Sequence, residues 1–384
     1  MRSLGHAIQS GLVSRSLHAL QPFVQNPLPL KPSPDSWVTG LVGDHPSTYS
    51  KSPRIWNAAF QDLGLDAVYA PIDVEPGNLA GLFRAIRRDP SVLGVNVTVP
   101  YKQAVISLLD EVDERAAGLD AVNTVVRTPD GELLGFNTDG EGALGNLTRP
   151  WPGQPEPFLR SLDRYSVLLI GAGGAASAVA FALAEAIGSR GRLFIANRTA
   201  ETALVLGERV SELFGNAQGM DEADAELLVP GIDLVVNAST RGQAGAKTIR
   251  NGMISYLEPY SALAPAAPPS IEDLADEPES ARLQRWLATA TDSILENHAL
   301  SMRLVTRVPR HTAFFDLVYA PAETTMLRHA RWGGRPALNG QGMIVFQAAA
   351  AFVDHIARPL LEANGYSGTI RERVVETMGL NWGS

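Results

Sequence analysis

The chain has 384 residues, of which 45% are hydrophobic and 19% are charged, and its formal net charge is -9. The length predicts two domains, the composition excludes wholesale disorder, and the acidic balance argues against binding nucleic acid through a broad basic face. Because the chain contains no cysteine, disulfides, thiolate metal sites and a cysteine nucleophile are excluded. No apolar run reaches the ~20 residues that span a bilayer, so we expect a soluble, cytoplasmic protein.

Residues 1–36 precede the first regular pattern and are predicted to be a disordered or targeting-like tail. The first 34 residues contain Arg2, Arg15 and Lys31 but no acidic residue, which is faintly similar to an organellar transit segment. Only two arginines support targeting, so a disordered tail or a misassigned start is the interpretation that we favour.

Regular patterning begins at Trp37, and residues 37–145 form the first predicted domain. Strand and helix patterns alternate along it, which indicates an α/β layer with crossover connections. The first helix is expected to have Ser52 as its cap and Pro53 at its first position. Strands are predicted at 38–43, 67–74 and 93–100, helices at 52–65, 77–90 and within 102–119, and a hairpin at 121–140.

Residues 160–336 form a second predicted domain, of the Rossmann type. Its strands are short apolar runs that begin near residues 166, 192, 232 and 313, as in a parallel sheet. Roughly seventy residues separate the last two strands, so we interpret 245–312 as an insertion with a helix at about 282–304. Residues 337–384 are predicted to be a carboxyl-terminal helical segment dominated by one long helix.

The run SVLLIGAGGAASA has the G-x-G-x-x-A form of a dinucleotide-binding turn. Gly171 is expected to make the tight turn, Gly173 to admit backbone amides to a pyrophosphate, and Ala176 to let the helix pack on the strand. The amino end of that helix offers free N–H groups to phosphates. The alternative is a strand-to-helix turn that binds nothing.

The end of the next strand predicts which dinucleotide is bound. An NAD site places an acidic residue there, about twenty residues after the turn, whereas this chain has Asn197, Arg198 and Thr199. An arginine in place of a carboxylate favours the 2'-phosphate of NADP. The alternative is a solvated surface arginine.

Short polar residues follow several strands of the first domain. Residues two apart on a strand share a face, so Asn96 and Thr98 are expected to point together while Val95, Val97 and Val99 point into the core. Singly, such residues are caps, turn formers or solvated charges. At the carboxyl ends of strands they would together suit a small polyhydroxylated acid. The cluster contains Ser50, Ser52, Asn96, Thr98, Lys102, Asn123, Asn137, Thr138 and Asp139.

Lys102 and Asp139 are candidates for a proton-transfer pair. An ammonium beside a carboxylate, both partly desolvated, can pass a proton to or from a substrate hydroxyl. The alternative is a structural ion pair.

Eight separated motifs make the chain similar to a known family. They are YSKSP, GVNVTVPYK, DAVNT, GFNTDG, GAGGAA, ANRT, FFDLVYAP and NGQGMIVFQAA. In order and approximate spacing they resemble the shikimate dehydrogenases and the related quinate/shikimate dehydrogenases. The resemblance extends from about Val38 to about Ala357, apart from the insertion.

The resemblance implies an amino-terminal α/β substrate domain, a Rossmann-type NADP-binding domain, and a carboxyl-terminal helix that returns to the first domain, with the active site between the two. It implies reversible hydride transfer between NADPH and the C3 ketone of 3-dehydroshikimate, giving shikimate and NADP. The cofactor would supply the hydride, and the protein would supply the alignment of the reactants and a proton. The implied partner is this small molecule, with no nucleic acid, membrane or metal, and we expect a monomer or homodimer.

The resemblance also implies residue roles. Lys102 and Asp139 match the catalytic pair, and Ser50 and Ser52 match hydroxyls that hold the substrate carboxylate. Further substrate ligands or their supports are Asn96, Thr98, Asn123, Tyr319 and Gln347. The implied pyrophosphate site is Gly171, Ala172, Gly173, Gly174 and Ala175, and the implied site for the adenosine phosphate is Asn197, Arg198 and Thr199. The residues implied to border the nicotinamide are Leu317, Gly340 and Met343.

Several positions depart from the family pattern. Thr202 stands where a second basic residue is frequent after the NRT motif, which weakens the NADP assignment. The usual N-A-T-P-x-G loop reads NASTRGQAG, with Ser239 and Thr240 in place of threonine and proline, and we expect Arg241 to add positive charge near the cofactor. Asp120 replaces a common glycine before AVNT.

Three alternatives remain open. A quinate or quinate/shikimate dehydrogenase using NAD or NADP would share these motifs. A regulatory relative without catalysis is disfavoured because Lys102 and Asp139 are both retained. The third is a specialised reductase of a modified cyclic substrate, since functions diverge on one fold. The insertion and the NAST loop are where such divergence would show.

Overall fold

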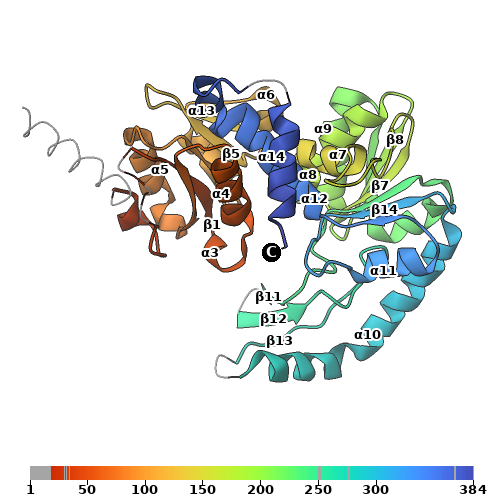
Figure 1. Ribbon diagram of the computed structural model, residues 1–384. Coiled ribbons are helices and arrows are strands. Elements are labelled where there is room, and N and C mark those ends of the chain that lie inside the picture. The colour runs from red at the N-terminus through yellow and green to blue at the C-terminus, as the bar shows by residue number, and fades with distance from the viewer. Residues whose placement is uncertain are drawn as a thin grey trace, which may run out of the picture. The chain divides into compact units, whose positions relative to one another are not determined.

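A computed structural model describes residues 19–29, 31, 33, 35–249, 252–274, 277–366 and 369–383. The chain forms two compact units, and Figure 1 labels many of their elements. The first unit comprises Met1–Gly145, Pro150–Glu156 and Ile344–Ser384, and the second Asn146–Arg149 and Pro157–Met343. The α/β fold class is confirmed. Within the described part of the chain, no helix is long and apolar enough to cross a membrane.

The first unit is built on a mixed sheet of six strands in the order β2-β1-β3-β5-β6-β4. β1 is parallel to β2 and β3, whereas β5 is antiparallel to both β3 and β6. The predicted hairpin is confirmed, and its turn contains Gly131 at a φ of +90°, a conformation that glycine adopts without strain. The strands are β1 (Trp37–Gly43), β2 (Ala67–Asp73), β3 (Gly94–Val97), β4 (Glu111–Val112), β5 (Thr124–Arg127) and β6 (Leu133–Phe136).

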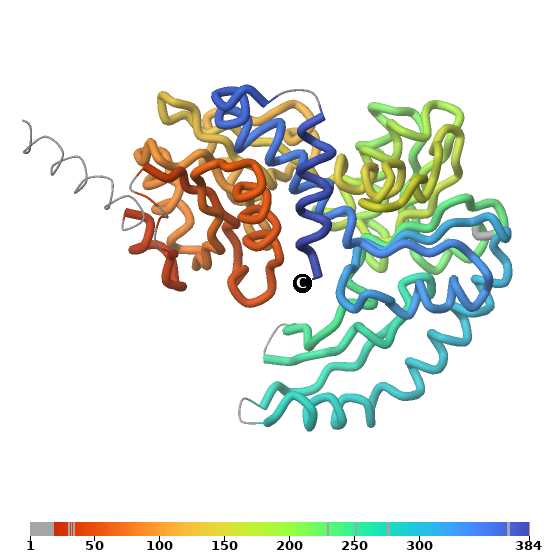
Figure 2. The backbone as a smooth tube through the Cα atoms, viewed as in Figure 1, coloured from red at the N-terminus to blue at the C-terminus, as the bar shows by residue number. Residues whose placement is uncertain are grey.

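Helices of the first unit cover this sheet. They are α3 (Pro46–Tyr49), α4 (Ser52–Asp62), α5 (Leu79–Arg88), α6 (Glu114–Leu119), α7 (Asp139–Thr148, shared with the second unit) and, from the carboxyl-terminal segment, α13 (Arg358–Ala363) and α14 (Ile370–Leu380). α4 buries Trp56, which stacks on Tyr69 of β2 at a ring distance of 4.6 Å and contacts Phe352 at 5.1 Å. The carboxyl-terminal segment, blue in Figure 2, is therefore part of the core of the first unit.

The predicted amino-terminal tail is corrected in its second half. Residues 1–18 lie outside the described residues, but Leu20 is 1% exposed and packs with Val24 in the core beneath α5. The Gln25 N–H donates to the Asp73 carbonyl at 2.9 Å, and Asn26 bonds both Pro71 and Asp73 of β2. Leu20 and Val24 lie just before the proline-rich run 26–36, and so short a stretch carries too few residues for a period to be read.

The predicted long carboxyl-terminal helix is also corrected. α12 (Gln341–Ala350) passes into a π-helix at Ala351–Ile356, and α13 follows it. The predicted start of this segment at residue 337 is wrong as well, because β15 (Ala337–Leu338) pairs in parallel with β14 of the second unit.

The second unit contains a parallel sheet of six strands in the order β15-β14-β10-β7-β8-β9. The strand order reverses at β7, with β10 on one side and β8 on the other, and ligands bind beside such a switch point at the carboxyl ends of the strands. The strands before β15 are β7 (Ser166–Ile170), β8 (Arg192–Asn197), β9 (Ala217–Asp221), β10 (Leu234–Asn237) and β14 (Ala313–Asp316). The helices are α8 (Gly174–Ile187), α9 (Ala200–Phe214) and α11 (Thr325–Trp332).

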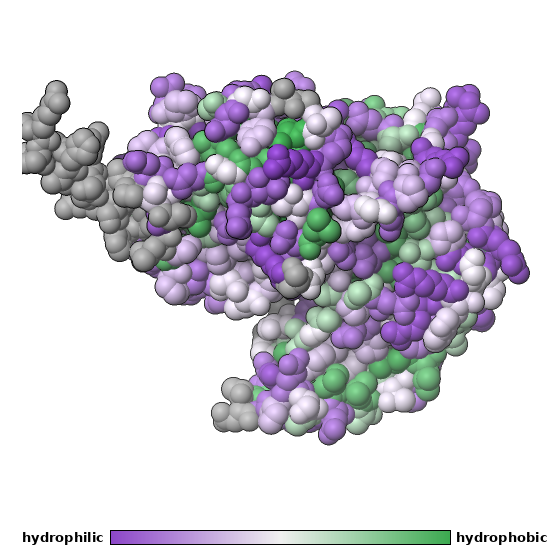
Figure 3. Space-filling model, viewed as in Figure 1, coloured by the Kyte–Doolittle hydropathy of each residue, from purple (hydrophilic) through white to green (hydrophobic). Residues whose placement is uncertain are grey.

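The insertion between β10 and β14 has a small core of its own. Its helix α10 (Glu279–Arg307) extends the predicted helix at both ends, and Trp286 at its buried face contacts Tyr256 and Tyr260. An antiparallel sheet, which the sequence pattern did not indicate, consists of β11 (Ala246–Ile249), β12 (Met253–Tyr256) and β13 (Ile271–Glu272). On the face in Figure 3, hydrophobic and hydrophilic patches are intermixed over this insertion.

Candidate functional site

Lys102 and Asp139 form an ion pair in the first unit. Lys102 Nζ donates to Asp139 Oδ2 at 2.6 Å. The Asp139 side chain is 3% exposed and that of Lys102 is 20% exposed, so the carboxylate is buried more deeply than its partner. The pair thus has the geometry of a positioned proton donor with a buried counter-ion.

Asn123 fixes the carboxylate of this pair. Its Nδ2 donates to Asp139 Oδ1 at 2.9 Å and to Thr138 Oγ1 at 3.2 Å, and its Oδ1 accepts from the Thr138 N–H at 2.9 Å. Asn123 is 5% exposed. Since both oxygens of Asp139 are bonded to named donors, the carboxylate has one defined orientation beside Lys102.

Asn96 extends these contacts across the sheet. Its Nδ2 donates to Thr124 Oγ1 at 3.1 Å, and its Oδ1 accepts from the Tyr69 hydroxyl at 2.9 Å. Burial raises the pKa of Tyr69 well above its usual value, while a hydrogen bond with Ser52 acts in the opposite direction. We call Ser52, Tyr69, Asn96, Lys102, Asn123, Thr124, Thr138 and Asp139 the polar cluster.

The end of β3 brings Lys102 to the cluster. β3 stops at Val97, and the Val122 N–H donates to the Lys102 carbonyl at 2.8 Å. Val95 and Val97 are buried as predicted, but Val99 is 64% exposed, so its predicted place in the core is wrong. The alternation of strand residues ends with the strand, and a turn with a Tyr101 N–H to Thr98 carbonyl bond replaces it.

Other predicted substrate residues lie around the polar cluster or apart from it. Ser52 was predicted as the helix cap, but it is the first residue of α4. Its N–H donates to Ser50 Oγ at 3.1 Å. Thr98 is half-buried after β3. Gln347 on α12 has a buried Oε1 without a hydrogen-bond partner among the described residues, and Tyr319 belongs to the second unit.

The dinucleotide turn follows β7 in the second unit. Gly171 has a φ of +116°, and a Cβ there would lie 2.9 Å from Ala238 C and Ser239 N. Gly173 caps α8, and both Gly173 and Gly174 have open space where a side chain would stand. Ala176 is fully buried against the sheet. A turn with free space at the amino end of a 14-residue helix fits a pyrophosphate, with Ala172 and Ala175 in the same turn.

The residues after β8 are polar, and some of them hydrogen-bond to one another. Asn197 Nδ2 donates to Thr202 Oγ1 at 2.7 Å and to the Thr199 carbonyl at 3.1 Å. Arg198 and Thr199 are exposed. Thr202 thus orients Asn197 instead of supplying a second positive charge.

The buried carboxyl of Asp316, at the end of β14, hydrogen-bonds to Asn237 at the end of β10. Asp316 Oδ1 accepts from Asn237 Nδ2 at 2.8 Å, and Oδ2 accepts from Thr324 Oγ1 at 2.6 Å. Burial raises the pKa of Asp316 to about 7, although these donors and the Val318 N–H lower it. Leu317 follows Asp316 directly and contacts Gly340, and Met343 is 4% exposed.

Two comparisons with known proteins decide the family. Residues 41–125 match the model of the shikimate dehydrogenase substrate binding domain. A shikimate dehydrogenase (NADP(+)) from Shouchella clausii is 34% identical over 316 residues, which cover 82% of this chain and 91% of that protein. The chain belongs to the shikimate dehydrogenase family.

Solved structures of this family have the same fold. Shikimate 5-dehydrogenase from Thermus thermophilus, in complex with NADP(H) and shikimate, is 27% identical with a TM-score of 0.59 and covers 89% of this chain and 99% of its own. Quinate dehydrogenase from Corynebacterium glutamicum, in complex with NAD, is 28% identical with a TM-score of 0.61 and covers 89% and 98%. The expected family membership and its oxidoreductase class are confirmed.

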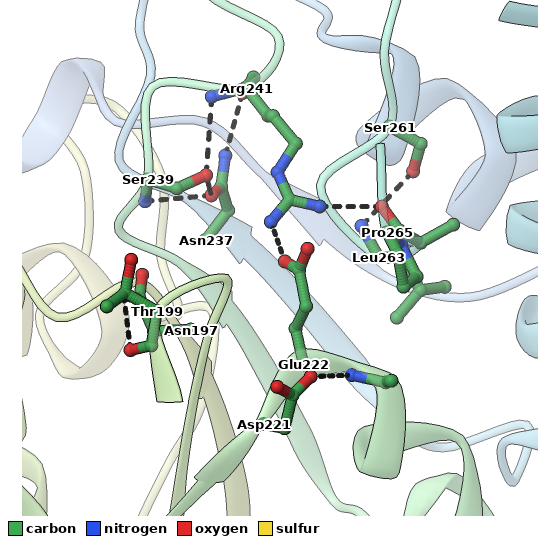
Figure 4. A network of polar contacts seen from close by, with 12 residues as sticks. Asn197, Thr199, Asp221, Glu222, Asn237, Ser239, Arg241, Ser261, Leu263 and Pro265 are labelled. Carbon is green, nitrogen blue, oxygen red and sulfur yellow. Dashed lines mark hydrogen bonds and ion pairs between the residues drawn. The ribbon is translucent and has the colours of Figure 1, made fainter. Parts of the chain in front are cut away.

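Two departures from the shikimate dehydrogenase pattern have structural explanations. Asp120 has a φ of +53°, a left-handed conformation that explains the glycine common at this position, and its carboxylate accepts from Gln103. The expectation that Arg241 adds positive charge is corrected, because Glu222 pairs with its guanidinium (Figure 4).

Sequence reasoning missed Tyr69, which bonds Asn96 and contacts Ser52. Only the strand order, in which β1 lies between β2 and β3, could have indicated that Tyr69 reaches Asn96. That order cannot be read from local sequence patterns. In the described part of the chain, no group of three or more His, Asp or Glu side chains could hold a metal ion.

Proposed function

We propose that this protein is an NADP-dependent shikimate dehydrogenase, which catalyses the reversible reduction of 3-dehydroshikimate to shikimate. The observation that supports this most is the ion pair of Lys102 with the buried Asp139 inside a cluster of amides and hydroxyls. Relatives at 34% identity carry the name shikimate dehydrogenase (NADP(+)).

Lys102 is proposed as the proton donor and acceptor. NADPH, when bound, supplies a hydride to the ketone carbon. In that direction the Lys102 ammonium donates a proton to the ketone oxygen, and in the reverse direction the amine accepts the proton of the hydroxyl. Asp139 Oδ2 accepts from Lys102 Nζ and holds the lysine in place.

The substrate is proposed to bind through uncharged polar groups around this pair. Ser50 and Ser52 would hold the carboxylate, and hydroxyls of the ring would contact the remaining residues. The unpartnered Oε1 of Gln347 supports this, since a buried acceptor without a donor costs free energy until a ligand hydroxyl fills the gap. The remaining proposed ligands or supports are Asn96, Thr98, Asn123 and Tyr319.

The cofactor is proposed to bind at the dinucleotide turn. Gly171 to Ala175 would hold the pyrophosphate, Asn197 to Thr199 the 2'-phosphate, and Leu317, Gly340 and Met343 would border the nicotinamide. The exposed Arg198 favours NADP. A guanidinium pairs strongly with the 2'-phosphate of NADP, whereas the free ribose hydroxyl of NAD offers only a weaker, uncharged partner. The proposed reaction requires no other protein. We also propose that the protein is cytoplasmic and is a monomer or a homodimer.

The test is an initial-rate assay of four combinations, shikimate or quinate with NADP or NAD. We expect the highest kcat/KM for shikimate with NADP. No reduction of NADP by shikimate in the wild type, or equal rates in the Lys102→Ala variant, would contradict the proposal.

The second candidate is a quinate or quinate/shikimate dehydrogenase. The observation that favours it is Thr202, which supplies a hydrogen bond to Asn197 and no charge for a phosphate. The highest kcat/KM for quinate with NAD in the same assay would support this candidate. Activity with neither substrate would favour a sensor or a reductase of another cyclic compound.

A further inference from the structure

The loop after β10, residues 238–242, lies directly against the dinucleotide turn. The Ala238 N–H donates to the Ile170 carbonyl at 2.8 Å, and a Cβ on Gly171 would touch Ala238 and Ser239. We call these residues the β10 loop. Since the turn and the loop are in van der Waals contact, a shift of the loop changes the space in which a dinucleotide would bind.

Arg241 anchors the β10 loop on two sides. Its Nη2 pairs with Glu222, which follows β9, and its Nη1 donates to the Ala264 carbonyl at 2.6 Å (Figure 4). The side chains of Arg241 and Glu222 are 12% and 11% exposed. The loop is closed by Asn237, whose Nδ2 donates to the Arg241 carbonyl at 3.0 Å while its Oδ1 accepts from the Ser239 N–H at 2.9 Å.

The insertion supplies one of these two anchors. Ala264 lies between β12 and α10, and its carbonyl also accepts from Asn297 Nδ2 of α10 at 3.1 Å. Asn297 is 3% exposed, and its Oδ1 accepts from the Ser261 N–H at 2.8 Å. The segment 261–264 is therefore held by α10 on one side and holds the guanidinium of Arg241 on the other.

We propose that the insertion is part of the nucleotide site: Asn297 of α10 fixes the Ala264 carbonyl, this carbonyl and Glu222 fix Arg241, and Arg241 positions the β10 loop beside the dinucleotide turn. Arg241 is a positioning residue, because its guanidinium is occupied by protein partners. The inference rests on the proposed function for the identity of the nucleotide.

The chemistry of the guanidinium explains why arginine stands at this position. Its planar fork donates to a carboxylate and a carbonyl at once, whereas a lysine ammonium on a flexible chain cannot reproduce both directions. Removing the cation entirely would leave Glu222 as a buried, uncompensated charge. Arg241→Lys, which keeps the charge, is therefore the informative variant.

The experiment measures NADPH binding by fluorescence titration and steady-state kinetics for the wild type, Arg241→Lys and Asn297→Ala. We expect the Kd and the KM for the nucleotide to rise about tenfold in both variants, with kcat at saturating nucleotide and the KM for shikimate within about twofold of the wild type. A variant that is only less stable would not separate the two KM values in this way.

The matched control is Arg307→Lys. Arg307 also joins α10 to the segment after β9, through an exposed pair with Glu226, but has no link to the β10 loop. Wild-type nucleotide binding in Arg241→Lys overturns the inference, and this variant decides it if Asn297→Ala does not fold. A wild-type protein that binds no NADPH overturns the proposed function instead, so the two failures are distinguishable.

Discussion

The polar cluster of the first unit is made of side chains, whereas the dinucleotide turn of the second unit is made of backbone. In the cluster, Asn123 and Asp139 are buried and each bonds named partners. At the turn, Gly173 and Gly174 leave open space, and Gly171 leaves no space for a methyl group.

This difference determines how each region can be damaged. The cluster depends on functional groups, so truncating a side chain removes its chemistry while the backbone stays in place. The turn depends on the absence of side chains, so adding one carbon blocks the approach of another backbone segment. Four substitutions, in order of decreasing expected effect on activity, test the comparison.

Lys102→Ala removes the proposed proton donor and should lower kcat about 10²- to 10⁴-fold, the usual contribution of general acid–base catalysis. The measurement is the rate of NADP reduction at saturating shikimate. Lys247→Ala, on the exposed strand β11, removes the same charge and should leave kcat unchanged. Equal kcat values for the two variants would contradict the role of Lys102.

Gly171→Ala adds a Cβ at a φ of +116°, 2.9 Å from Ala238 C and Ser239 N. We expect the Kd for NADPH to rise at least about tenfold, and the free energy of unfolding to fall by more than about 1 kcal/mol. Gly215→Ala is the control, since Gly215 has a φ of +72° and open space around it. It should lose stability while binding NADPH normally, and normal binding by Gly171→Ala would refute the steric account.

Arg198→Ala should weaken NADP binding about tenfold and leave NAD binding unchanged, because one charge-assisted hydrogen bond to the 2'-phosphate is lost. The ratio of kcat/KM for NADP to that for NAD reports this effect. Arg192→Ala, at the start of the same strand β8, serves as the charge control. An unchanged ratio in Arg198→Ala would mean that the arginine is only a solvated surface charge.

Asp316→Asn should change the pH dependence of stability. Burial raises the pKa of Asp316 from 3.8 to about 7. Between these values the folded protein keeps a proton that the unfolded chain has released, so the free energy of unfolding falls as pH rises, by up to about 1.4 kcal/mol per pH unit. Above pH 7 the loss is complete.

Urea unfolding at pH 5 and pH 7 measures this slope. The wild type should lose stability relative to Asp316→Asn between the two values, because the amide does not titrate. A difference between the two proteins that is the same at both pH values would contradict a raised pKa. We expect kcat to change least in this variant.

The sequence predicted those features that depend on local patterns. The hairpin around Gly131 and the alternation of Val95 and Val97 follow from turn chemistry and strand period. The polar residues that follow the strands suggested Lys102 and Asp139 as a pair, although three strands and the helix α6 separate them and no periodicity connects them. The family resemblance added their catalytic role.

What the sequence missed depends on strand order and on contacts distant in the chain. Tyr69 reaches Asn96 only because β1 lies between their strands, and Glu222 neutralises Arg241 only because the β10 loop lies beside the segment after β9. Val99 was misplaced because a strand pattern does not show where the strand ends. The packing of Leu20 and the sheet of the insertion carry too few residues for a period to be read.

The central claim is that this chain transfers a hydride between shikimate and NADP. Shikimate carrying deuterium on the carbon of the oxidised hydroxyl tests it directly, with mass spectrometry of the reduced nucleotide as the measurement. We predict that the deuterium appears in NADPH with the wild type and is nearly absent over the same time with Lys102→Ala. NADPH without deuterium, or no NADPH from shikimate at any enzyme concentration, would contradict the claim.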